Sequence, residues 1–286
     1  MSNPPVSSLP PLPTLGVATL LRALVKRPSP SADSSLSASY RLQRIEREHV
    51  RRYNAAFGFA GAAVPITFLY LLAQRAQLAT LLDQPIPFRI PGLIHVENRL
   101  EMHGEIDPDA AFTLTTSVSL PAPAPNGAVS CVLETRAYVG ERLAFACDST
   151  YLVKRGSPGK RRETAAPVMP AGAQVGSWRL ASNAGRAYAA LSGDWNPIHL
   201  WPWTAKLMGM REPIIHGMHS VAQACAFLEQ VQGRRVFTLD SRFKAPVPLG
   251  AEVTLIRALN DATFVVSCND RIAIEGAIDR HPALSS

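Results

Sequence analysis

An aspartate and a histidine lie five residues apart in the run Gly193-Asp194-Trp195-Asn196-Pro197-Ile198-His199. Pro197 bars a regular helix through this run and restricts Asn196 to an extended backbone, so a bent loop can bring both side chains to one point. A carboxylate and an imidazole that face one cavity can share a water or a hydroxyl group, one taking a proton as the other supplies one. The spacing therefore predicts an acid–base site on Asp194 and His199.

Each of these residues also has a structural interpretation. Asp194 alone would be read as a helix N-cap or turn residue, and His199 alone as a hydrogen-bonded core histidine. Their combination with Asn196 and Pro197 favours a catalytic role for both residues over a structural one.

A second group, Ile215-His216-Gly217-Met218, stands at the start of an apolar helix. A backbone N–H in the first turn has no partner within the helix and lies at the positive end of its dipole, so Gly217 could bind an oxyanion. The alternative is that Gly217 only permits close packing. We interpret His216 and His219 as packing or capping residues.

An internal repeat indicates which elements position these groups. The matches are Tyr53, Ala55 and Gly58 with Tyr188, Ala190 and Gly193 (offset 135), Pro65-Ile66 with Pro213-Ile214, each opening an apolar helix (offset 148), and residues 97–100 with 240–243 (offset 143). The second half thus holds 13 more residues (148 − 135) between Gly193 and Pro213 than the first half holds between Gly58 and Pro65. Those extra residues contain Asp194 and His199.

Each half continues as apolar, alternating or β-branched runs that predict antiparallel strands. The expected strands are 93–100, 112–120, 129–139 and 144–153, then 236–243, 253–259, 263–268 and 272–278. A helix followed by such a meander predicts an α+β fold in which the sheet curls around an apolar helix. This explains why no charged residue occurs from Ala55 to Ala73, and we therefore do not expect a membrane span there.

Composition divides the chain into four segments: a flexible Pro/Ser-rich tail (1–39), a first half (40–153), a basic linker (154–173) and a second half (174–286). The net charge of +7 attracts anions. The basic cluster of the linker has no interleaved aromatic residues to stack bases, so no nucleic acid is expected. Cys131, Cys147, Cys225 and Cys268 form no CxxC pair, which indicates reduced thiols in a cytoplasmic protein.

The run from Tyr188 to His199, followed by Ile215-His216-Gly217-Met218, closely resembles the MaoC-like dehydratase family, which includes the R-specific enoyl-CoA hydratases. Pro65-Ile66-Thr67 and Ile94-His95-Val96-Glu97-Asn98 resemble the first half of its tandem hot-dog members, so the resemblance leaves out only the tail and the linker. It implies a tandem double hot-dog fold and the reversible hydration of trans-2-enoyl thioesters to (R)-3-hydroxyacyl thioesters in fatty-acid metabolism.

The resemblance also implies roles for single residues. Asp194 and His199 are the implied catalytic pair, with the acid and base parts left open between them; Gly217 is the implied oxyanion donor, and Asn196 the implied support of the loop. Gly58 is followed by Phe59-Ala60-Gly61, with neither Asp nor His, so we expect the first half to be inactive and to complete the paired unit beside an acyl tunnel.

The substrate implied is an acyl-CoA or acyl carrier protein thioester, with no bound cofactor and no metal, since no cluster has ligand spacing. Arg242, expected beside a sheet edge, or the cluster from Lys154 to Arg162 could meet the anionic carrier. A further homodimer of the two-half unit stays open. Two rival functions remain at this point: a hot-dog acyl thioesterase and a non-catalytic acyl-thioester-binding protein.

Overall fold

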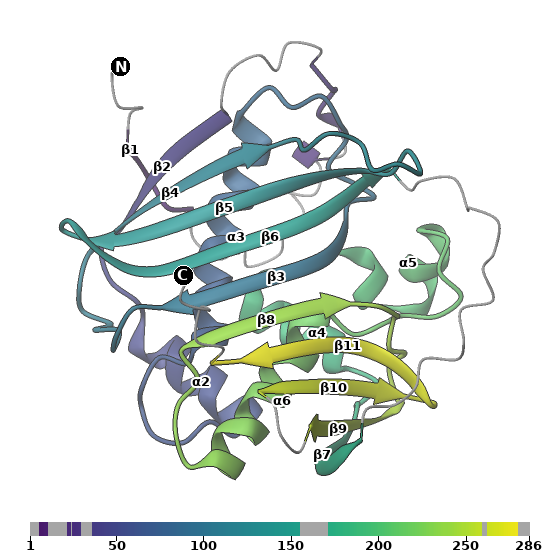
Figure 1. Cartoon of the computed structure of the whole chain (residues 1–286). Helices are drawn as coiled ribbons and strands as arrows, with labels where there is room; N and C mark the ends of the chain where they lie inside the picture. The colour runs from purple at the N-terminus through teal and green to yellow at the C-terminus, as the bar shows by residue number, and fades with distance from the viewer. Residues whose placement is uncertain are drawn as a thin grey trace.

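The computed structural model describes residues 6–10, 22–23, 25–29, 36–154, 171–258 and 262–279. Within these residues, eleven strands form one sheet, and the helices pack on one of its faces (Figure 1). The strands are β1 (Val6–Ser8), β2 (Leu36–Leu42), β3 (Ile94–Met102), β4 (Phe112–Ser119), β5 (Val129–Val139), β6 (Arg142–Lys154), β7 (Gly172–Arg179), β8 (Thr238–Phe243), β9 (Glu252–Ala258), β10 (Thr263–Cys268) and β11 (Arg271–Ile278). The helices are α2 (Arg47–Phe57), α3 (Ile66–Asp83), α4 (Ala184–Ser192), the 3-10 turn η1 (Pro197–His199), α5 (Pro202–Leu207) and α6 (Gly217–Gln232).

The sheet consists of two halves with the same strand order. Read from the two outer ends toward the middle, the first half runs β2-β4-β5-β6-β3 and the second β7-β9-β10-β11-β8. All pairs within these halves are antiparallel, and β1 adds a parallel strand beside β2. The halves join where β3 pairs with β8, with Asn98 opposite Ser241. The repeat makes these two residues equivalent (98 + 143 = 241), so an approximate twofold axis passes between them.

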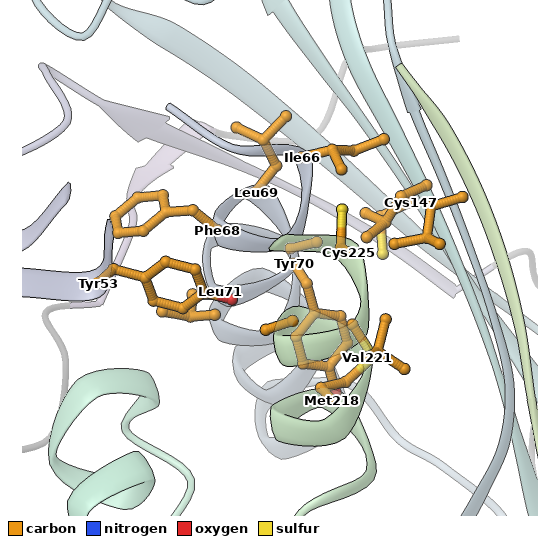
Figure 2. Close-up of a cluster of buried hydrophobic side chains, with 14 of the residues drawn as sticks. Tyr53, Ile66, Phe68, Leu69, Tyr70, Leu71, Cys147, Met218, Val221 and Cys225 are labelled. Atoms are coloured by element: carbon orange, nitrogen blue, oxygen red, sulfur yellow. The ribbon is translucent and has the colours of Figure 1, made fainter. Parts of the chain in front are cut away.

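The core lies where the sheet curls around α3 and α6, which also contact each other. Figure 2 shows Tyr70 of α3 close to Met218 and Val221 of α6. Helix α3 is buried on nearly every side, which is why its first half carries no charge. In the described part of the chain, no helix is both long enough and apolar enough to span a membrane.

The expected α+β fold, with each half an antiparallel sheet around an apolar helix, is confirmed. All eight expected strands are present, with ends that agree to within two residues where they are described. Three strands were not expected: β1, β2 and β7. The strand β1 lies inside the segment assigned to the tail and β2 begins there, whereas β7 begins inside the segment assigned to the linker. The match of Pro213 with Pro65 as a helix start was wrong, because Ile214 instead forms a bridge to Pro248 and α6 begins at Gly217.

Candidate active site

The loop that carries Asp194 begins where α4 ends. Both α2 and α4 end at a glycine in the left-handed region, Gly58 with φ 79° and Gly193 with φ 78°, and these are the two glycines that the repeat matches with each other. The Asp194 N–H then donates to Ser192 Oγ at 3.2 Å. This bond turns the chain away from the helix axis and into the extra segment of the second half.

The Asp194 carboxylate is half-buried and accepts two hydrogen bonds, one on each oxygen. The Asn196 N–H donates to Oδ1 at 3.1 Å, and Gln74 Nε2 of α3 donates to Oδ2 at 3.0 Å. Burial raises the pKa of the Asp194 carboxyl. The His216 and His199 side chains, together with the two N–H donors, more than offset that effect and hold its pKa below the usual value. The carboxyl is therefore ionised at neutral pH.

The chain then bends through η1 and delivers His199 to the same place. Asn196 Oδ1 accepts the Ile198 N–H at 3.3 Å, and Thr204 Oγ1 donates to the Pro197 carbonyl at 2.7 Å. Gly185 of α4 lies against this turn, where an added Cβ would stand only 1.9 Å from the His199 carbonyl oxygen. The backbone of His199 thus packs directly on α4, and only a glycine fits at position 185.

His199 is buried, and its contacts determine which ring nitrogen carries the proton. Nδ1 lies 2.9 Å from the Ile214 carbonyl oxygen, which can only accept, so Nδ1 is the donor. Burial lowers the pKa of His199, and this effect outweighs Asp194 and the Ile214 carbonyl, which raise it. The ring is therefore neutral at neutral pH, with a free lone pair on Nε2 available as a base.

His216 also belongs to the site, although the sequence indicated only packing or capping. It occupies the N-cap position of α6, but its side chain makes no capping hydrogen bond. Its ring stacks on that of His199, with centroids 3.7 Å apart, and its Nε2 donates to the Asp194 backbone carbonyl at 2.9 Å. Burial lowers the pKa of His216 to about 3. This second neutral imidazole thus supports the His199 ring and the Asp194 backbone.

Asp194, His199 and His216 each offer one polar atom, and these atoms lie within 4.8 Å of one another. That separation suits one bridging water between the carboxylate and the imidazole. It also raises the question of a metal ion, which the spacing in the sequence did not suggest. Each imidazole already directs one nitrogen at a carbonyl oxygen, which leaves one nitrogen on each ring for a further contact.

Gly217 is the first residue of α6, where the backbone N–H has no carbonyl partner within the helix. A Cβ at this position would lie 2.4 Å from Cε1 of Phe243. Close packing against Phe243 therefore requires glycine here, whatever the N–H binds. Both interpretations of Gly217 remain compatible with the structure.

The sequence did not indicate that two further residues belong to the site. Gln74 comes from the other half of the chain, 120 residues before Asp194, and Gly185 stands 14 residues before His199. Only the packing of α3 and α4 against the loop brings them into contact with it.

Arg242 was expected beside a sheet edge, and this was wrong. Its strand, β8, lies in the middle of the sheet between β3 and β11, and its Nε binds Glu97 Oε1 at 3.1 Å. Arg242 and Glu97 line a groove of about 720 Å³, and Asp194, Asn196, His199 and Gly217 do not line it. Neighbouring strand residues point to opposite faces, so Arg242 points away from the face on which Phe243 meets Gly217. Of the basic cluster from Lys154 to Arg162, all but Lys154, which ends β6, lies outside the described residues.

Comparisons with known proteins identify one family. Residues 162–267 match the family described as "MaoC like domain". The chain is 30% identical to 3-hydroxyacyl-thioester dehydratase X of Mycobacterium tuberculosis over 76% of this chain and 78% of that protein. It is 35% identical to the (R)-specific enoyl-CoA hydratase of Aeromonas caviae over 32% of this chain and 72% of that protein.

Among solved structures, the crystal structure of HtdX from M. tuberculosis superposes with a TM-score of 0.68 at 26% identity, over 84% of this chain and 98% of that one. The agreement therefore covers both halves of the fold as well as the Asp194–His199 segment. On these grounds the chain belongs to the MaoC-like dehydratase family, in its double hot-dog form.

Proposed function

We propose that this protein is a hydro-lyase that hydrates trans-2-enoyl thioesters and dehydrates (R)-3-hydroxyacyl thioesters in fatty-acid metabolism. The observation that carries the proposal is the meeting of an ionised carboxylate and a neutral imidazole at Asp194 and His199, with polar atoms within 4.8 Å. The names of the relatives, a 3-hydroxyacyl-thioester dehydratase and an (R)-specific enoyl-CoA hydratase, support the same reaction.

In the proposed mechanism, a water bridges the Asp194 carboxylate and His199 Nε2. The lone pair on Nε2 takes a proton from this water while the water oxygen forms a bond to C3 of the enoyl thioester. Electrons of the C2–C3 double bond move toward the thioester carbonyl and give an enolate. The Asp194 carboxylate orients the water and stabilises the imidazolium that forms.

The same imidazolium then supplies the proton to C2. Asp194 has no proton to give, because its pKa is held low, and His199 Nδ1 keeps its hydrogen bond to Ile214. His199 is therefore base and acid in turn, which balances the protons of the reaction and adds the hydroxyl and the hydrogen to one face. We assign the Gly217 N–H to the enolate oxygen, since helix N-termini stabilise developing negative charge.

The substrate is proposed to be the thioester of coenzyme A or of acyl carrier protein, and the carrier leaves with the product, so no bound cofactor enters the steps above. We propose that the first half has no catalytic activity of its own. It completes the sheet and places α3 beside the site. We also propose a cytoplasmic location, supported by four cysteines that are all buried and unpaired.

The test is loss of the enoyl-thioester absorbance when purified protein meets crotonyl-CoA and then a longer trans-2-enoyl-CoA. We expect the band to disappear without free thiol, and Asp194→Asn and His199→Ala to lower kcat by about 10²- to 10⁴-fold each with unchanged folding. In D₂O, the deuterium at C2 should lie on the same face as the new hydroxyl. Release of free thiol would favour a thioesterase, and an unchanged band at every chain length would favour a binding protein.

A further inference from the structure

Gln74 is the one residue outside the second half that binds the Asp194 side chain among the hydrogen bonds of the described residues. It lies on α3, the central helix of the half that lacks an Asp–His pair, and its Nε2 donates to Asp194 Oδ2 at 3.0 Å. The active site is therefore not complete within its own half.

The central helix of the second half also carries a glutamine that reaches the opposite half. Gln223 stands six residues after Gly217, the first residue of α6, whereas Gln74 stands eight residues after Ile66, the first residue of α3. Gln223 Nε2 donates across the halves to the Phe57 carbonyl at 3.2 Å, at the end of α2. Phe57 is equivalent to Ser192 in the repeat (57 + 135 = 192). The two central helices thus each direct a glutamine at the opposite half. Gln74 of α3 reaches the loop that follows α4, and Gln223 of α6 reaches the last residue of α2.

The two glutamines differ in what they bind. Gln223 donates to a backbone carbonyl, so its hydrogen bond links one half to the other without reaching a side chain of the site. Gln74 meets a side-chain carboxylate, which has rotational freedom of its own and must keep one orientation to hold a water against His199. An amide suits this contact because it donates a hydrogen bond and cannot itself gain or lose a proton near neutral pH.

We propose that Gln74 is a positioning residue for the reaction: it fixes the Asp194 carboxylate and so makes the half without an Asp–His pair necessary for activity in the other half. This inference rests on the proposed function for its kinetic part. Its structural part, the hold of Gln74 on the ionised carboxylate, can be measured without turnover.

The kinetic experiment compares Gln74→Met with Gln223→Met, which removes an amide donor that also crosses between the halves. We expect Gln74→Met to lower kcat for crotonyl-CoA about tenfold to a hundredfold, with KM little changed. Gln223→Met should keep the wild-type kcat, although both variants lose some thermal stability. Equal, near-wild-type kcat values in the two variants would overturn the proposal and leave Gln74 as a fastening between the halves.

Gln74→Glu should change the pH dependence of kcat in a way that a purely structural link between the halves would not. A protonated glutamic acid can still donate to Asp194 Oδ2, whereas an ionised one places two carboxylates in contact, which strongly raises one pKa of the pair. We therefore expect the variant to be active at low pH and to lose kcat as pH rises, which the wild type and Gln223→Glu should not do. A wild-type pH profile for Gln74→Glu would contradict the proposal.

The measurement that needs no turnover is the Asp194 carboxyl titration, followed by ¹³C NMR and assigned with Asp194→Asn. Since the Gln74 donor helps to hold the carboxyl pKa low, the pKa should rise in Gln74→Met and stay unchanged in Gln223→Met. An unchanged pKa in Gln74→Met would overturn the inference even if the wild type hydrates enoyl thioesters. A raised pKa in a protein without hydratase activity would instead overturn the proposed function alone.

Discussion

His199 and His216 stack with ring centroids 3.7 Å apart and planes 29° apart, and each ring directs one nitrogen at a backbone carbonyl. Two imidazoles in such contact cannot easily both be charged, and burial lowers the pKa of each ring. His199 therefore keeps its Nε2 lone pair as the medium becomes mildly acidic.

The pH profile of kcat/KM should report this directly, since it follows the ionisations of the free enzyme. A histidine base is lost on protonation, and the His199 pKa lies below its ordinary value of about 6.5. We expect kcat/KM for crotonyl-CoA to stay level from about pH 8 to 6.5 and to fall only below that range. A fall centred above pH 7 would contradict a neutral, buried His199 as the base.

Gly185→Ala should impair the site without touching a catalytic side chain. The new Cβ would stand 1.9 Å from the His199 carbonyl oxygen, so either α4 or the η1 turn must shift by about 1 Å to reach an ordinary contact. We expect kcat to fall about a hundredfold. Steady-state kinetics with Ala187→Gly as control would check this, because that exposed α4 position should lose about 1 kcal/mol of stability and no activity. Full activity in Gly185→Ala would show that the turn is not held tightly.

Gly217→Ala separates packing from chemistry, because alanine keeps the backbone N–H. Its Cβ would lie 2.4 Å from the Phe243 ring, which we expect to cost about 1–3 kcal/mol of stability and to displace the start of α6. The double variant Gly217→Ala with Phe243→Leu should recover part of both stability and kcat. If the double variant regains stability but no activity, the position of the N–H itself is what the reaction needs.

Acid should unfold this protein through buried histidines. Burial lowers the pKa of His216 to about 3 and that of His95 and His219 to about 4, whereas each has a pKa near 6.5 when unfolded. Between pH 6.5 and about 4 the unfolded chain thus binds more protons, so stability falls with falling pH by at most about 1.4 kcal/mol per pH unit for each histidine. Urea unfolding at several pH values would measure the slope.

His219→Phe removes one of these groups and should flatten that slope, while it leaves stability at pH 8 little changed. An identical pH dependence in wild type and variant would contradict this, because it would mean that the pKa of His219 is the same in the folded and unfolded states. His219 is suited to this comparison because it makes ring contacts with Phe57 and Tyr188.

Much of the fold could be predicted because its information is local. The alternating runs predicted eight of the strands, and the repeat matched Gly58 with Gly193, each of which ends a helix in the structure. The strands β2 and β7 were missed because their small and polar residues have little strand preference of their own. Pairing with β4 and β9 decides their conformation, and that pairing is not visible in either segment alone.

The same difference between local and long-range information applies to the site. Asp194, Asn196 and His199 share one short loop, and Pro197 restricts it enough to predict their meeting. The contacts of Gln74 and His216 depend on how α3 and α6 pack across the molecule, which residue spacing does not reveal. Arg242 was misplaced for the converse reason: the order of strands in the sheet, and not the strand itself, decides whether a residue stands at an edge.

The near-symmetry about Asn98 and Ser241 has an evolutionary consequence. In an assembly of two identical chains, every substitution is made twice, so a helix cannot be tailored to one site without the same change at the other. Two copies fused in one chain escape that constraint. Here Gln74 of α3 binds a carboxylate, while Gln223 of α6 binds only a backbone carbonyl, so the two halves of one chain make different contacts across their boundary.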